Sequence, residues 1–361
     1  MENLFSCRII RIKSVLQRKS PLKSHIINVC SFSSSFIFLV KKSKSQKIIY
    51  MTISSIDEYY YYRDKGWEGY NMSSESAIRS FLRQRPLVGY FLLTFLISWA
   101  ILIPAVYVFL QLRVETYPWW LLLLGMPGAY GPSIAAVIMA GVLEGKSGVR
   151  RLLSKFLIWR VHLTWYLFVF LTPLALLFAA IGLIALQVGG IGQFDPTNWY
   201  LLIVVYILIA LPVGPLAEEL GWRGYALPRL QAKYSALVSS LILGLIWTFW
   251  HIPLFWLPGA AIPSIFEVTA WTIFLYLGSI TGEAILLTAV YNNTKGSVLI
   301  AVISHTMFNA AGNIVFSMFP DISFSQHLQI YIASIILMWI LGIMLLYLKP
   351  GTLIRENDII S

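Results

Sequence analysis

The sequence has little charge and almost no cysteine. Of its 361 residues only 12% are Asp, Glu, Lys or Arg, whereas 58% are hydrophobic. A soluble domain is nearer one quarter charged, so this composition excludes an ordinary soluble protein. The two cysteines, Cys7 and Cys30, lack metal-ligand spacing and predict no disulfide framework. The His-Glu-x-x-His motif of zinc proteases is also absent from the sequence.

Long apolar runs occupy most of the chain instead. The mean hydropathy is +0.74, and the runs approach the roughly 20 residues that a helix needs to cross a bilayer. They lack the alternation of barrel strands, so we expect helices. The predicted fold is an all-α polytopic membrane protein with about eight transmembrane helices, at 87–111, 119–142, 163–188, 199–216, 236–257, 268–290, 298–319 and 328–348.

Basic residues are concentrated in alternate connections. Most Lys and Arg precede the first segment or follow the second, fourth, sixth and eighth, whereas the other connections contain Arg113, Glu115, Asp195, Glu267 and Asp321. The positive-inside rule then predicts that both termini are cytoplasmic. We expect a bacterial cytoplasmic membrane and an active site that opens toward the cytoplasm. The net charge of +11 is not gathered into a patch, so it indicates topology and no nucleic-acid partner.

Residues 1–71 differ from the rest. The first fifty are rich in Ser, Lys and Arg, and Met72 begins a plausible mature chain. The codons of Gly66–Gly69 must form a purine-rich run that resembles a bacterial ribosome-binding site. We therefore predict that 1–71 is disordered or results from a misplaced gene start, that 72–349 is the transmembrane domain, and that 350–361 is a cytoplasmic tail.

Ionisable side chains at membrane depth are few, and each is a functional candidate because it is costly to bury. Glu219 and Arg223 are four residues apart with the carboxylate first, the favoured spacing for an ion pair. Glu218 is rotated by about 100° from Glu219 on a helix and so remains unpaired. A poorly solvated carboxylate is a usable proton acceptor. The alternative is that all three residues form a structural charge cluster at the membrane surface.

Four further polar residues lie deep in the later segments. His305 and Asn309 are four apart and share one helix face, and His251 follows several aromatic residues. Each alone is typical of packing or interhelical hydrogen bonding. Glu283 suggests a structural or water-lined role. Together with Glu218, the histidines and Asn309 are the groups needed to activate water and stabilise an oxyanion.

The order and spacing of these residues resemble a known family. Glu218–Arg223 matches a Glu-Glu-x-x-x-Arg motif, Trp247–His251 an aromatic-x-x-x-His motif, and His305–Asn309 a His-x-x-x-Asn motif. The chain resembles the CAAX-protease and bacteriocin-processing (CPBP) family of intramembrane endopeptidases. The likeness is strongest over 215–313. Members of that family usually have Phe where Trp247 stands.

The resemblance implies a mechanism. Glu218, assisted by His251, would deprotonate a water that attacks a scissile amide. His305 and Asn309 would donate hydrogen bonds to the oxyanion. The substrate would be a peptide or a lipidated protein at the membrane, prenylated or bacteriocin-like.

Straight helices would keep Glu218 and His251 apart, because His251 lies deeper in its segment. We therefore expect the fourth helix to continue to about Arg223, where the arginine restrains Glu219 and shapes the site. Residues 225–235 should then turn back along the inner surface.

The family name also raises the question of a metal. A zinc ion would need His251, His305 and Glu218 as ligands from separate segments; a metal-free glutamate mechanism is the preferred hypothesis. Two other functions remain open. One is a catalytically silent membrane scaffold or immunity protein of the same family, and the other is a transporter that uses Glu283 and the Glu218 cluster as a polar path.

Overall fold

The computed structural model divides the chain into two compact units, Met1–Ser80 and Phe81–Ser361. The structure describes six N-terminal strands and residues 77–112, 119–197, 211–257, 261–262 and 266–348, with single positions at 200 and 208. The tail at 350–361 and most of the predicted segment 199–216 lie outside the described residues.

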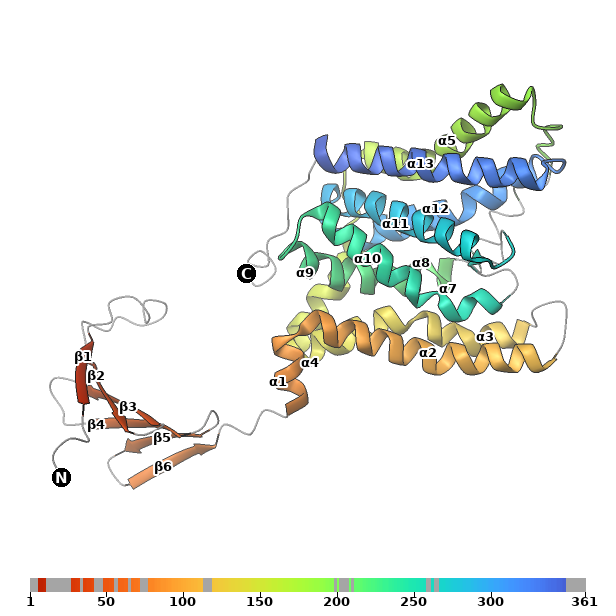
Figure 1. The fold of residues 1–361 in the computed structure, drawn as a ribbon. Helices are drawn as coiled ribbons and strands as arrows, with labels where there is room; N and C mark the ends of the chain where they lie inside the picture. Colours follow the sequence, from red (N-terminus) through yellow and green to blue (C-terminus); the bar gives the residue numbers. More distant parts are fainter. Residues whose placement is uncertain are drawn as a thin grey trace. The chain divides into compact units, whose positions relative to one another are not determined.

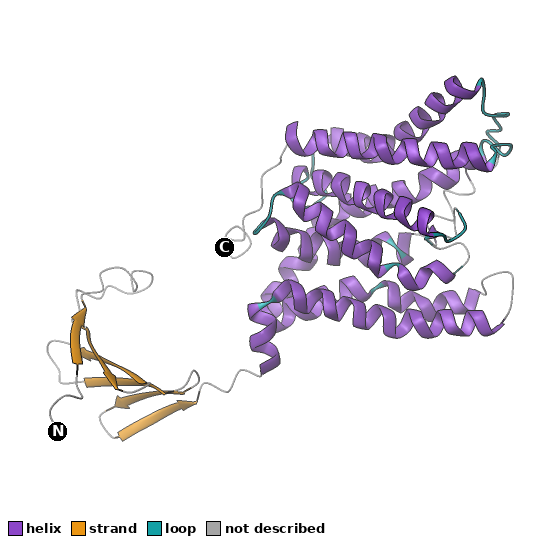
Figure 2. Cartoon of the chain, in the orientation of Figure 1, coloured by secondary structure: helices purple, strands orange, loops and turns teal. Residues whose placement is uncertain are grey.

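The first unit contains a sheet whose strands follow one another in chain order, each antiparallel to the next (Figure 2). The strands are β1 (Ser6–Ile10), β2 (Ile27–Phe32), β3 (Ser35–Lys41), β4 (Ile48–Ser54), β5 (Glu58–Arg63) and β6 (Gly66–Asn71). They occupy the segment for which we expected disorder or a misplaced gene start. The gene-start hypothesis and the boundary at Met72 stay predictions.

The described residues from α1 onward form helices and loops (Figure 1). The long helices are α2 (Pro86–Leu112), α4 (Gly131–Ser154), α5 (Leu163–Val188), α10 (Ala236–Trp250), α11 (Ala270–Asn293), α12 (Val298–Ser317) and α13 (Phe324–Leu348). The shorter ones are α1 (Ala77–Gln84), α3 (Trp119–Ala129), η1 (Lys155–Leu157), α7 (Leu211–Val213), α8 (Pro215–Glu219), the π-helical η3 (Leu220–Ala226), α9 (Leu227–Gln231) and η4 (Ile252–Trp256).

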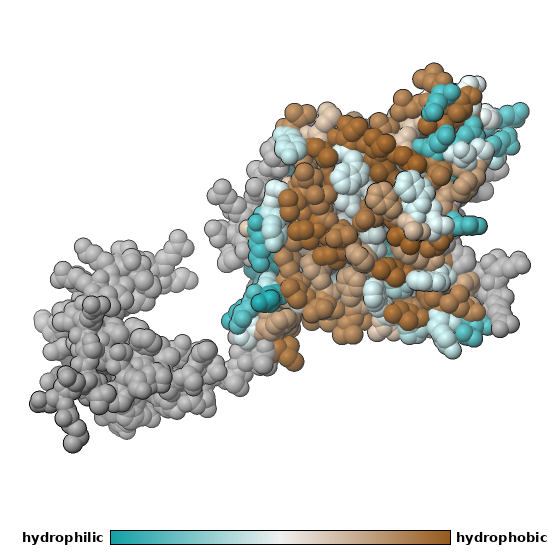
Figure 3. Space-filling model, viewed as in Figure 1, coloured by the Kyte–Doolittle hydropathy of each residue, from teal (hydrophilic) through white to brown (hydrophobic). Residues whose placement is uncertain are grey.

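Five of the described helices, α2, α5, α11, α12 and α13, are long and apolar enough to cross a membrane, which is fewer than the eight spans predicted. The segment 119–142 is divided between α3 and α4, which meet at Tyr130, because Pro132 starts a new helix there. The segment 236–257 yields the shorter helix α10 followed by η4. Hydrophobic residues cover the side of the helical unit in Figure 3. The chain is an integral multi-pass membrane protein; the cytoplasmic location of its termini stays a prediction.

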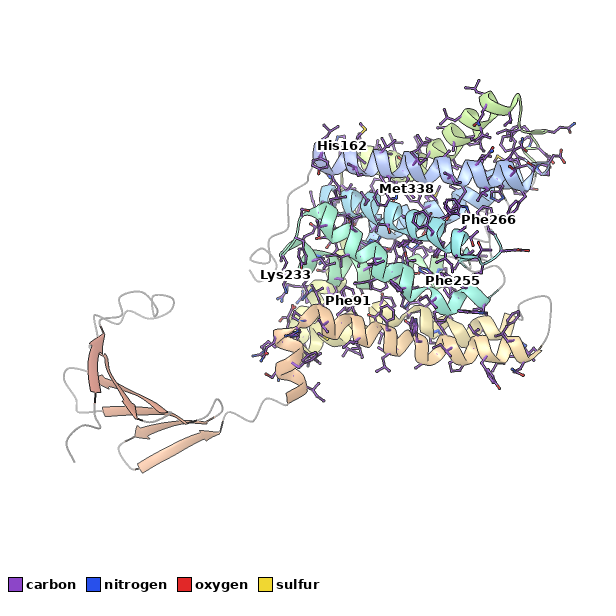
Figure 4. The ribbon with its side chains drawn as sticks, in the orientation of Figure 1. Phe91, His162, Lys233, Phe255, Phe266 and Met338 are labelled. Carbon is purple, nitrogen blue, oxygen red and sulfur yellow. The ribbon has the colours of Figure 1, made fainter. Side chains whose placement is uncertain are left out.

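The helical unit has two distinct ends (Figure 4). At the end where Lys233 is labelled, Ser297 donates a hydrogen bond to the carbonyl of Ile158. At the end where Phe266 is labelled, α13 begins and Phe266 packs edge-to-face on Phe324. We call these the Lys233 end and the Phe266 end.

Helix α11 is the most buried of the candidate spans and packs against α10, α12 and α13. Two glycines permit this close packing. A Cβ at Gly244 of α10 would lie 2.7 Å from the Cα of Thr281, and one at Gly282 would lie 2.7 Å from Trp339. Small residues let membrane helices approach closely. The result is that Glu283, next to Gly282, is held in the centre of the bundle.

The segment after Pro215 differs from our expectation. Helical backbone continues from α8 through η3 to Gln231, and Tyr225 and Leu227 are fully buried. The prediction that 225–235 turns back along the surface is therefore wrong. The longer helix also places Glu218 at the depth of His251. About 13 residues separate Glu218 from the end of α9, and α10 is about 15 residues long, so both side chains lie about 20 Å from the Lys233 end.

Candidate active site

Glu218 is buried and accepts hydrogen bonds from two indoles. Trp247 Nε1 donates to Oε2 at 2.6 Å, and Trp222 Nε1 donates to the same oxygen at 3.2 Å. Neither donor is charged, and no described Lys or Arg forms an ion pair with this carboxylate. Our sequence analysis missed both indoles as donors. Trp222 could have been found from its spacing, since it lies four residues after Glu218 on a helix.

Glu219, unlike Glu218, is bonded to a charged side chain. Arg223 Nη1 donates to Oε1 at 2.8 Å, which confirms the predicted pair, and His305 Nδ1 lies 2.9 Å from the same oxygen. The carboxylate and the guanidinium are fully buried, and the guanidinium lies 4.5 Å from the centre of the Trp247 ring. The contact with His305 was not predicted. It means that the first motif orients the histidine of the third.

His251 is fixed in one tautomer by the backbone. Its Nδ1 lies 2.8 Å from the carbonyl oxygen of Trp247. Because a carbonyl can only accept, Nδ1 must bear the hydrogen, and in the neutral ring Nε2 keeps its lone pair. The rings of Trp250 and Tyr276 pack edge-to-face against the imidazole. His251 can therefore accept a hydrogen bond from a water through Nε2.

A cavity of about 830 Å³ connects the candidate residues. Glu218, His251, His305 and Asn309 all line it, so the structure brings the four predicted catalytic side chains to one space. Glu219 and Arg223 lie outside its lining, behind His305. The volume is typical of a small-ligand or peptide site.

Glu283 adds a third carboxylate to the site. It lines the same cavity, and its Oε1 lies 3.9 Å from His305 Nε2, so His305 stands between two carboxylates. This position fits the water-lined role suggested by the sequence. The pair of carboxylates favours an imidazolium, which has hydrogens on both nitrogens.

The three-ligand zinc site considered above stays a prediction. Within the described part of the chain, no three His, Cys, Asp or Glu side chains are grouped to hold a metal ion. His251 and His305 each use Nδ1 for a neighbour, an arrangement that is also common for metal-ligating histidines, and Glu218 accepts from indoles. We derive no step through a metal.

Lys155 supports the π-helical turn next to the site. Its Nζ donates to the carbonyl of Gly224 at 2.6 Å and to the hydroxyl of Tyr291 at 3.1 Å. Burial and, to a lesser extent, the nearby Arg229 lower the pKa of Lys155 to about 7, while Glu144 opposes the shift. A π-helical turn often accompanies a functional site, and here Lys155 connects it to α11.

This lowered pKa predicts a pH-dependent stability. Between pH 7 and 10.5 the unfolded chain binds more protons at Lys155 than the folded chain does, so stability should rise with pH in that window. Lys155→Met should flatten the rise in the thermal midpoint measured in detergent from pH 7 to 9.5. Lys233→Met, at an exposed position of the same end, is the control. Equal slopes for the two variants would disprove this role of Lys155.

The fold and the cavity define a multi-pass membrane protein with a buried Glu/His cluster of the kind found in an active site. The model of the family "Type II CAAX prenyl endopeptidase Rce1-like" matches residues 199–311. The "CAAX prenyl protease 2" of Methanococcus maripaludis is 29% identical over 227 residues, which cover 61% of this chain and 81% of that protein. Residues 199–311 belong to the Rce1-like type II CAAX prenyl endopeptidase family. The members of this family are membrane proteases that act on peptides.

Proposed function

We propose that the protein is an intramembrane endopeptidase in which Glu218 and His251 activate a water for attack on a peptide bond. One observation carries the proposal. Of the two adjacent carboxylates, Glu219 is paired with Arg223, whereas Glu218 accepts from neutral indoles and lines the cavity with His251. Glu218 is thus the carboxylate that can take a proton.

The proton transfer needs two acceptors around one water. Both recorded hydrogen bonds to Glu218 fall on Oε2, which leaves Oε1 for the water. His251 Nε2 accepts from the same water and orients it. As the water oxygen bonds to the carbonyl carbon, its proton passes to Glu218, which can then protonate the leaving nitrogen as the C–N bond breaks.

In this proposal His305 and Asn309 stabilise the oxyanion. Glu219 holds His305 Nδ1, so an imidazolium directs Nε2–H into the cavity, and the Asn309 amide supplies a second N–H from one turn further along α12. Donors of this kind typically contribute about 10²- to 10³-fold to turnover.

The substrate class follows from the family. "CAAX prenyl protease 2" names an activity on prenylated peptides for the relative, and we propose a membrane-associated peptide, prenylated or bacteriocin-like, for this chain. The test is cleavage of a fluorogenic farnesylated peptide by the purified full chain in lipid nanodiscs. A silent scaffold or a transporter predicts no cleavage by the wild-type protein.

Chelation tests the metal-free mechanism. Because the proposed proton acceptor is a carboxylate, we expect treatment with 1,10-phenanthroline or EDTA, followed by gel filtration, to leave the rate within about twofold. A loss that added zinc restores would contradict the mechanism.

A further inference from the structure

Four polar residues follow one another along the cavity face of α12. His305, Asn309, Asn313 and Ser317 occur at every fourth position, and all four line the cavity. Residues four apart share a helix face. They extend from the catalytic cluster to the last residue of the helix, a distance of about 18 Å. The first two belong to the proposed chemistry, and the last two have no role in it.

Exposure increases along this row. His305 is buried, whereas Asn309, Asn313 and Ser317 are exposed, and Ile314 and Val315 on the other side of the helix are buried. An amide facing lipid at this depth would be costly, and polar side chains inside a span face a water-filled space or a partner. The row therefore forms the hydrated wall of the cavity. This wall extends from the catalytic cluster to the Phe266 end.

The spacing of the row matches an extended peptide. Four helical residues advance about 6 Å, and two residues of an extended strand advance about 6.6 Å. An asparagine amide has two N–H donors and a carbonyl acceptor. Asn313 Nδ2 donates to the carbonyl of Asn309 at 3.4 Å and the Ser317 hydroxyl donates to the carbonyl of Ile314 at 2.6 Å, so a peptide would bond to Asn313 in addition to this contact and would donate an N–H to the Ser317 oxygen. A strand beside α12 would thus present a backbone group to each successive side chain, and about five of its residues would fit along 18 Å.

The other walls exclude some ligands. Pro173 and Leu177 of α5 give an apolar side, and Ser334 of α13 gives a polar one. Of the described lining residues none is Lys or Arg, while Glu218 and Glu283 are present. The imidazolium of His305 already lies between the carboxylates of Glu219 and Glu283, so a phosphate or a carboxylate would meet more negative than positive charge here, and the cavity favours an uncharged backbone.

We propose that Asn313 and Ser317 form a peptide-binding track that holds the substrate in an extended conformation between the Phe266 end and the scissile bond. This inference rests on the proposed endopeptidase function. The track acts on backbone groups and is therefore tolerant of side-chain sequence. It contributes binding of about five residues on one side of the cleaved bond.

The first test is kinetic. Farnesylated peptides are lengthened one residue at a time at each end, and KM and kcat are measured for the wild type, Asn313→Leu and the control Thr306→Val. Thr306 lies on α12 outside the cavity lining and donates to the carbonyl of Val302. We expect KM to fall with length at one end and then level off. Asn313→Leu should remove this gain, raising KM about fivefold for long peptides with kcat unchanged. A KM that does not depend on peptide length, or equal effects of the two variants, would contradict the proposed peptide-binding track.

The second test needs no catalysis. Cys7 and Cys30 are replaced by serine, Ser317→Cys is introduced together with Glu218→Gln, and maleimide labelling is followed with and without the long farnesylated peptide. We expect the peptide to slow labelling at position 317 and not at a cysteine placed at exposed Lys233. Absence of protection at 317 would overturn the track. Absence of cleavage by the wild type would instead overturn the endopeptidase proposal.

Discussion

Glu218→Gln should reduce kcat by about 10²- to 10⁴-fold while leaving the protein folded, because the amide keeps the shape of the carboxylate and cannot take a proton. The side-chain carbonyl can still accept from Trp247 and Trp222, so the hydrogen bonds that position residue 218 remain. The measurement is the single-turnover rate on the farnesylated peptide, with the thermal midpoint recorded on the same preparation.

Two outcomes would contradict this assignment. A rate within tenfold of wild type would exclude Glu218 as the general base. A fall in thermal midpoint as large as that of a core mutation would show that the carboxylate has a structural role.

Glu219→Gln should instead destabilise the protein. Arg223 is fully buried and shares Glu219 with His305, so the substitution leaves a buried positive charge without its partner. Breaking a buried pair in this way costs about 3–5 kcal/mol, and we expect a decrease in thermal midpoint of about 10 °C. Turnover should fall as well, because His305 loses the group that orients its ring.

Glu144→Gln is the matched control for that prediction. Glu144 also has two arginine partners, Arg151 and Arg229, but its side chain is 25% exposed and that of Arg151 is 40% exposed. Ion pairs at such positions contribute at most about 1 kcal/mol. If Glu219→Gln and Glu144→Gln shift the midpoint equally, the buried network around Arg223 does not stabilise the fold as we infer.

The sequence predicted the side chains of the site better than it predicted the helices that hold them. The pair of Glu219 and Arg223 followed from its spacing of four, and the three motifs contain the four proposed catalytic residues that line the cavity. The local spacing is sufficient for such pairs because they lie on one helix. The contact between Glu219 and His305 could not be predicted in this way, since 86 residues separate them and only the packing of α8 against α12 brings them together.

The helix boundaries were less predictable for a physical reason. Hydropathy ended the fourth segment at residue 216 because charged residues follow, yet the helix continues to Gln231 since Glu219 and Arg223 neutralise each other inside the bundle. Charge marks the end of a span only when it faces water. A paired charge is compatible with the interior.

Two predictions about sidedness conflict once the cavity is located. Basic connections at the Lys233 end predicted that this end is cytoplasmic, and we also expected the site to open toward the cytoplasm. The polar row of α12 leads to the opposite, Phe266 end. Labelling of Ser317→Cys in intact cells with a membrane-impermeant maleimide distinguishes the two. If position 317 is labelled in intact cells, the cavity opens outside and the Lys233 end is cytoplasmic, as the positive-inside rule predicts. If it is labelled only after permeabilisation, the site opens toward the cytoplasm and the orientation predicted from the basic residues is wrong.

The most direct measurement of the central claim is an experimental structure of the Glu218→Gln protein with an uncleaved farnesylated peptide bound. We predict a water between the residue 218 side chain and His251 Nε2, about 3–3.5 Å from the scissile carbonyl carbon. The carbonyl oxygen should point at His305 Nε2 and Asn309 Nδ2. A scissile carbonyl bound away from these four side chains, or no space for a water beside residue 218, would contradict the claim.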